Sequence, residues 1–120
     1  MTSKDYPEIN DHLRAVMNQL GREIPSTMRS FGGLHAAATG AGALTGATKE
    51  LMALSIGIAV HCDGCIAYHV HDAIAAGATH AEVVETIGVA IMMGGGPAVV
   101  YGCEAFEALE QFETAARRQR

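Results

Sequence analysis

The stretch at residues 50–69 reads ELMALSIGIAVHCDGCIAYH, and it decides the fold that the sequence predicts. Strong helix formers open the stretch, the dipeptide Asp63-Gly64 interrupts it, and apolar residues then resume at helical spacing. This pattern predicts two helices joined by a tight turn, the first over about 47–61 and the second beginning near Asp63. The two cysteines of the stretch fall at that turn.

The rest of the chain also has helical periodicity. Apolar residues recur at intervals of three and four in further segments, which we expect to be helices over roughly 8–20, 25–39, 80–94 and 97–117. Thr79 and Glu82 have the spacing of a capping box, which marks the start of one of them. No segment alternates convincingly as a strand would. The predicted fold class is therefore an all-α bundle of about six helices, forming a single domain over residues 1–120.

The predicted core is made of small and aliphatic side chains, because apolar residues make up 49% of the chain and Trp is absent. The helix at 47–61 is apolar almost all round, so we expect it to be buried on most sides. We expect the last helix to bury Cys103 as a small apolar residue. The buried stripe expected on the second helix consists of Met28, Phe31, Leu34 and Ala38. So high an apolar fraction also suggests that other subunits cover part of the surface.

Charge and composition exclude several classes of protein. The formal charge of −5 opposes binding to nucleic acid or to an anionic membrane, since both need a basic face. Residues 1–7 lack the apolar segment of a signal peptide, and no apolar run reaches the length of a membrane span. We therefore expect a cytoplasmic protein. In that compartment three cysteines more often serve catalysis or metal binding than a disulfide framework.

Cys62 and Cys65 form a C-x-x-C pair at the predicted start of a helix. Free amides and the positive end of the helix dipole there stabilise a thiolate, the reactive form of cysteine. The spacing lets the two sulfurs form a reducible disulfide, so the pair can cycle between two redox states. His69 shares a helix face with Cys65 and can take its proton. The helix start favours Cys62 as the attacking thiol and His69 favours Cys65, which leaves both orders open.

Glu50 is the fourth candidate residue. It precedes Cys62 by twelve residues, which corresponds to about 18 Å of helix at 1.5 Å per residue. Glu50 reaches His69 only if the two helices pack antiparallel. In that arrangement the carboxylate orients the imidazole and stabilises its charged form, as the third group does in triad-like sites. Taken alone, Glu50 is read more simply as a solvated carboxylate.

A metal site is the main alternative for the cysteine pair. Zinc usually needs four ligands and a second pair is missing, although His61, His69, His71 or Cys103 could complete a set. Two idle buried thiols, or a redox-sensing module without catalysis, are further alternatives. The remaining histidines, which we expect to be structural or on the surface, are His12, His35 and His80.

The pattern Glu50-x11-Cys62-x2-Cys65-x3-His69 resembles the active-site signature of the alkyl hydroperoxidase D (AhpD)-like proteins, within the carboxymuconolactone decarboxylase superfamily. The flanking segments 48–51, 76–79 and 93–97 agree, and the resemblance extends over about residues 24–110. It implies an all-α AhpD-like fold and a homo-oligomer, commonly a trimer or hexamer. It also implies thiol-dependent reduction of a hydroperoxide or disulfide, with electrons from a dihydrolipoyl or thioredoxin-type dithiol and with no metal or organic cofactor.

In that family the His and the Glu activate the second Cys, through a relay that can include water. Here those roles fall on His69, Glu50 and Cys65. The first Cys, Cys62 in this chain, completes the disulfide and exchanges with the partner.

The best-known peroxidase members carry a His immediately before the second Cys. Here that residue is Gly64, so the relay is shorter unless His61 substitutes. The decarboxylase branch lacks the Cys pair. An enzyme acting on a small lactone or acid, with His69 as proton carrier, is the alternative activity.

Overall fold

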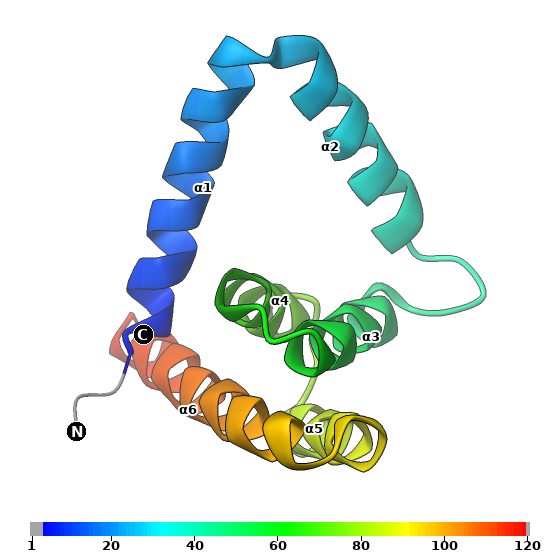
Figure 1. Cartoon of the computed structure of the whole chain (residues 1–120), viewed down its shortest axis with the longest axis vertical. Helices are drawn as coiled ribbons and strands as arrows, with labels where there is room; N and C mark the ends of the chain where they lie inside the picture. The colour runs from blue at the N-terminus through cyan, green and yellow to red at the C-terminus, as the bar shows by residue number, and fades with distance from the viewer. Residues whose placement is uncertain (1–3, 120) are drawn as a thin grey trace.

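The computed structural model describes residues 4–119, which form helices and no strands. In chain order the helices are α1 (Tyr6–Glu23), α2 (Pro25–Thr39), α3 (Gly46–Ala59), α4 (Asp63–Ala75), α5 (His80–Gly94) and α6 (Gly96–Arg118), as Figure 1 shows. The all-α prediction with about six helices is confirmed. The first helix is longer at both ends than the apolar periodicity predicted.

The helix boundaries follow from local chemistry visible in the sequence. Thr79 and Glu82 form the predicted capping box at the start of α5, where each side chain accepts a hydrogen bond from the backbone amide of the other. These bonds satisfy amides that have no partner within the helix. At the end of α4 the chain turns at Gly77, whose φ of 99° is readily adopted only by glycine.

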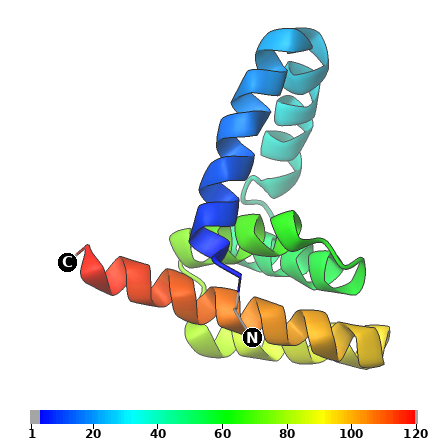
Figure 2. The same cartoon turned by 60° about the vertical axis from the view of Figure 1, so that its left-hand side comes forward.

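The helices are arranged as two layers and an arm. The α3–α4 hairpin forms one layer and the α5–α6 hairpin the next (Figures 1 and 2). The α1–α2 hairpin is the arm: the start of α1 packs against α4 and α6, and the rest of the hairpin projects from the two layers. The Cα radius of gyration is 14.5 Å, compared with about 13.6 Å expected for a compact chain of this length. The arm accounts for this expansion. Among the described helices, none combines the length and the hydropathy needed to cross a membrane.

The core lies where α3, α4, α5 and α6 meet. Its fully buried aliphatic side chains are Leu54, Ile58, Ile66, Val70, Val83 and Leu109. Between them lie buried alanines, which let the helices approach closely. The aliphatic, alanine-rich core therefore agrees with the composition.

Two predictions of burial are wrong for the single chain, those for α2 and for Cys103. Every residue of α2 is described and none is buried, with Phe31 and Leu34 55% and 63% exposed. The reason is that α2 belongs to the arm and has no second layer over its apolar face. On α3 one stripe stays open, since Ile56 is 62% exposed, but the other sides of the helix are buried or half-buried, as the sequence predicted. Cys103 is exposed because it falls outside the buried stripe of α6, which includes Gly102 and Ala105 on either side of it.

Candidate active site

The turn between α3 and α4 places the cysteine pair. At the end of α3 the amide of His61 donates to the carbonyl of Ile58 at 3.2 Å, and that of Cys62 to the carbonyl of Gly57 at 3.0 Å. These two bonds form a Schellman motif. They hold His61 in the left-handed region, with φ of 61°, where glycine is the usual residue. The motif therefore places Cys62 at the start of the next helix.

Cys62 is the N-cap of α4, as the sequence predicted. Its Sγ accepts a hydrogen bond from the amide of Cys65 at 3.1 Å. The two sulfurs are joined in a disulfide, with the Cα atoms 5.2 Å apart. Gly57 makes room for this arrangement, because a Cβ at that position would lie only 3.1 Å from the Cβ of Cys65. The pair therefore lies where α3 approaches α4 closely.

Glu50 and His69 meet at the middle of the α3–α4 hairpin. Their side chains are 9% and 18% exposed, and Nδ1 of His69 lies 2.8 Å from Oε2 of Glu50. With the carboxylate ionised, Nδ1 carries the hydrogen and donates it. Nε2 is then left free to accept a proton. The antiparallel packing that the relay required is therefore present, and Glu50 is not a solvated surface residue.

A pocket of about 250 Å³ adjoins the pair. From α4 it is lined by Gly64, Cys65, Tyr68 and His69. The arm supplies the opposite wall, which consists of Leu13, Met17, Met28, Phe31, Gly32 and His35. Sequence reasoning missed this wall, because no spacing along the chain relates α1 and α2 to the cysteines. The pocket is mostly apolar and exposes the second cysteine together with its histidine.

Gly64 stands where the best-known peroxidases have a histidine, and the structure gives a steric reason why a larger residue would not fit freely. A Cβ at this position would lie 3.3 Å from Cδ2 of Leu13. That approach is tighter than ordinary van der Waals contact, so the side chain of Leu13 would have to shift by a few tenths of an ångström. In this chain the arm takes the space beside Gly64.

Tyr68 connects the arm to the relay. Cζ of Arg14 lies 3.9 Å from the centroid of its ring, and the same guanidinium donates to Asp72 at 2.7 Å. The Tyr68 ring lies edge-on between the rings of His35 and His69, with centroid distances of 5.9 and 5.2 Å. Nε2 of His35 is buried and has no hydrogen-bond partner within residues 4–119. His35 was predicted to be a structural or surface residue, and it lines the pocket.

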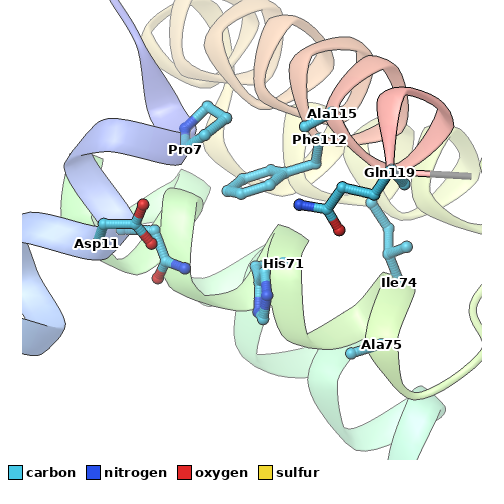
Figure 3. A pocket seen from close by; sticks show the side chains of 10 residues that line it. Pro7, Asp11, His71, Ile74, Ala75, Phe112, Ala115 and Gln119 are labelled. Atoms are coloured by element: carbon cyan, nitrogen blue, oxygen red, sulfur yellow. The ribbon is translucent and has the colours of Figure 1, made fainter.

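The two histidines that flank the cysteine motif lie elsewhere. The exposed ring of His61 stacks on Tyr101, with centroids 4.6 Å apart and planes 9° from parallel. His71 lines a different pocket of about 270 Å³, together with Asp11 and Phe112 (Figure 3). Neither histidine contributes to the wall around Cys65.

The described residues offer no set of ligands for a metal. No group of three or more His, Cys, Asp or Glu side chains within residues 4–119 is arranged to hold an ion. The zinc alternative therefore gains no support from the described part of the chain.

Comparisons with known proteins identify the family of the chain. The model of the carboxymuconolactone decarboxylase family matches residues 25–108. An uncharacterized protein of Cupriavidus necator is 38% identical over 93 residues, which cover 75% of this chain and 82% of that protein.

Two solved structures have the same fold. The apo form of a carboxymuconolactone decarboxylase family protein from Legionella pneumophila superposes with a TM-score of 0.87 at 39% identity, covering 92% of this chain and 98% of that one. A family member from Thermotoga maritima, described as "possibly involved in antioxidative response", gives 0.73 at 26% identity, with 86% and 94% covered. With its cysteine pair, its buried His–Glu pair and these matches, the chain belongs to the carboxymuconolactone decarboxylase family.

Proposed function

We propose that this protein is a thiol-dependent oxidoreductase of the AhpD-like type, in which Cys62 and Cys65 reduce a hydroperoxide or a disulfide. The observation that carries the proposal is that Cys65 and His69 line one pocket, while His69 is hydrogen-bonded to the buried Glu50. A thiol that shares a pocket with an oriented imidazole has the arrangement of an activated nucleophile. The antioxidative description of the Thermotoga maritima relative is consistent with this chemistry.

The proposed cycle starts from the dithiol. Nε2 of His69 takes the proton of Cys65, and Glu50 stabilises the imidazolium that results. The thiolate attacks an oxygen of the hydroperoxide, the O–O bond breaks, and the alkoxide leaves as an alcohol after taking the proton from His69. Cys65 is now a sulfenic acid. Cys62 attacks its sulfur, which forms the disulfide and releases water.

The same pair can reduce a disulfide substrate. Cys65 then forms a mixed disulfide, and Cys62 displaces the second thiol of the substrate. In either case a dithiol of the dihydrolipoyl or thioredoxin type resets the enzyme by attacking the Cys62–Cys65 disulfide. Cys62 is the proposed site of that attack, because it is half-buried and lies outside the pocket, where a partner protein can approach it. The cycle needs no metal or organic cofactor, and the reducing cytoplasm is its proposed compartment.

We also propose that the protein works as a homo-oligomer, a trimer or hexamer. Apolar side chains are strongly exposed on several helices of the single chain, and a second copy is the occupant that would cover them. The most exposed of them lie on α2 (Leu34), on α3 and its C-cap (Ile56 and Val60), on α5 (Met92 and Met93) and on α6 (Val100). Light scattering that gives the mass of one chain would contradict this part of the proposal.

The activity is tested by turnover with a panel of hydroperoxides and dithiol donors. We expect the wild-type protein to consume an organic hydroperoxide in the presence of dihydrolipoamide or a thioredoxin-type donor. Cys62→Ser and Cys65→Ser should each abolish turnover. Cys103→Ser is the matched control, because Cys103 is exposed on α6 and does not line the pocket. Equal activity in all four proteins would exclude thiol chemistry.

A second candidate follows from the name of the family and from the His–Glu pair. His69, oriented by Glu50, could move a proton on a small lactone or acid bound in the pocket. This reaction would survive both Cys→Ser substitutions and would be lost in His69→Gln. The same set of variants therefore separates the two activities.

A further inference from the structure

The first described residues of the chain are fastened to α6. The amide of Tyr6 donates to Oε1 of Gln111 at 2.8 Å, and Nε2 of Gln111 donates to the carbonyl of Lys4 at 2.7 Å. The side chain of Tyr6 is fully buried beside these bonds. The backbone of Lys4 is therefore held in place, although its side chain is half exposed.

The ammonium group of Lys4 bridges two carboxylates from different helices. Its Nζ lies 2.7 Å from Oδ2 of Asp63 on α4 and 2.5 Å from Oε1 of Glu104 on α6. The hydrogen bonds to Asp63 and Glu104 hold the pKa of Lys4 above its ordinary value, so the group stays charged throughout the working pH range. One cation thus stands between two anions at the start of α4.

Asp63 directly follows Cys62 and opens the helix that Cys62 caps. The helix dipole stabilises a thiolate at this end. The carboxylate of Asp63 opposes that effect, because two negative charges come close together. Tyr6 of α1 and Glu107 of α6 belong to the same group of charges, because Tyr6 interacts with Asp63, Glu104 and Glu107. Three more charged or titratable groups lie near the turn. These are Lys4 from the N-terminal segment, Glu104 from α6 and His61 from the end of α3.

We propose that Lys4 is a positioning residue for the thiol chemistry, which by pairing with Asp63 keeps the start of α4 favourable for the Cys62 thiolate. The inference rests on the proposed function and adds a residue distant in sequence, on a segment outside the pocket. Without Lys4, both carboxylates face the turn uncompensated. The thiolate of Cys62 then forms at higher pH. Cys62 becomes a poorer leaving group when the second thiol of the donor displaces it from the mixed disulfide, so exchange with the donor slows.

The test is a thiol titration that needs no substrate. In a Cys65→Ser, Cys103→Ser background only Cys62 titrates, and its thiolate is followed by ultraviolet absorbance against pH. We expect Lys4→Gln to raise the midpoint of the Cys62 titration by about half a pH unit at low salt. A shift of this size corresponds to the interaction of the thiolate with one unit charge several ångströms away in a dielectric close to that of water. Asp63→Asn should lower it, and the double variant should titrate near the unsubstituted background. Lys4→Arg should keep the midpoint unchanged.

Arg22→Gln is the control, because it removes one positive charge from an exposed residue near the end of α1, on the arm. A shift in Lys4→Gln no larger than in Arg22→Gln would overturn the proposal, as would a shift in the same direction for Lys4→Gln and Asp63→Asn. Because the titration involves no oxidant, it can succeed even if the protein reduces no hydroperoxide. Conversely, turnover that depends on both cysteines, with no Lys4 effect, would contradict this inference alone.

Discussion

The α3–α4 hairpin buries one side of each of its helices, whereas the α1–α2 hairpin leaves most of its second helix exposed. Leu54, Ile58, Ile66 and Val70 of the first hairpin are completely buried, and no residue of α2 is. Yet both hairpins line the pocket at Cys65. The groups proposed to react thus stand on the well-packed hairpin, and an open arm forms the wall that faces them. Reactive geometry needs positions fixed within fractions of an ångström, whereas an apolar wall tolerates adjustment.

The largest expected effect comes from breaking the buried pair in the packed hairpin. Glu50→Gln keeps the shape of the side chain but removes the charge that we propose orients His69 and stabilises the imidazolium formed in the cycle. We expect kcat/KM to fall about 100-fold, within the range that general acid–base groups contribute. The matched control is Glu113→Gln, since Glu113 pairs with His80 at 2.9 Å on the surface, away from the pocket. An equal loss in both variants would contradict the special role of the buried pair.

The second prediction compares one glycine in each hairpin. Gly57→Ala places a methyl group 3.1 Å from the Cβ of Cys65, and we expect this overpacking to lower the free energy of unfolding by about 1–3 kcal/mol. At Gly33 of α2 a methyl group would meet no atom within 4 Å, so Gly33→Ala should stabilise the helix by about 0.5–1 kcal/mol. Urea unfolding measures both. A gain in stability for Gly57→Ala would show that the hairpin is not tightly packed.

The third prediction concerns the wall contributed by the arm. Phe31 lines the pocket and Leu34, one helical turn further on, does not, although both are more than half exposed. Phe31→Ala should raise KM for a bulky organic hydroperoxide several-fold and change kcat little, because it removes uniform binding. Leu34→Ala should leave KM unchanged. The measurement is steady-state kinetics with a bulky and a small hydroperoxide. Equal KM values for the two variants would contradict the placement of Phe31 in the substrate-binding wall.

The smallest effect separates two equivalent helix ends. Two residues after the last residue of α3, His61 adopts the left-handed conformation, and Gly77 does so at the same position after α4. His61→Gly removes a conformational cost of about 1 kcal/mol, and loss of the ring stacking on Tyr101 partly offsets the gain. We expect a net rise in melting temperature of a few degrees. Gly77→Ala should lower it, so a fall in both variants would exclude strain at His61.

The same contrast explains how far the sequence could predict the molecule. Capping residues, helix formers and the Asp63-Gly64 break are local signals, and they sufficed for the helices and for Cys62 as an N-cap. The antiparallel packing that brings Glu50 to His69 was only a condition at the level of sequence, and the structure meets it. Burial is decided by what packs against a helix, so the apolar pattern of α2 predicted more burial than one chain provides. The prediction that Cys103 is buried was wrong for a related reason, because its apolar neighbours do not indicate which face of α6 is buried.

The pocket wall and the Lys4 bridge were beyond local reasoning altogether. His35 and Phe31 reach Cys65 only because the arm folds back over α4, and Lys4 reaches Asp63 across 59 residues of sequence. Contacts of this kind depend on the placement of whole helices. A polar residue in an unremarkable stretch, such as His35, therefore carries no signal of its role until that placement is known.

The most direct test of the proposed thiol cycle is to determine the redox state of each cysteine after mild oxidation. Fully reduced protein is mixed with one equivalent of an organic hydroperoxide, quenched by alkylation and examined by peptide mass spectrometry. The proposed cycle predicts a Cys62–Cys65 disulfide in proportion to the peroxide consumed, with Cys103 recovered as an alkylated free thiol, and a much slower reaction in His69→Gln. Peroxide that leaves Cys62 and Cys65 fully alkylated, or that oxidises Cys103 first, would contradict it.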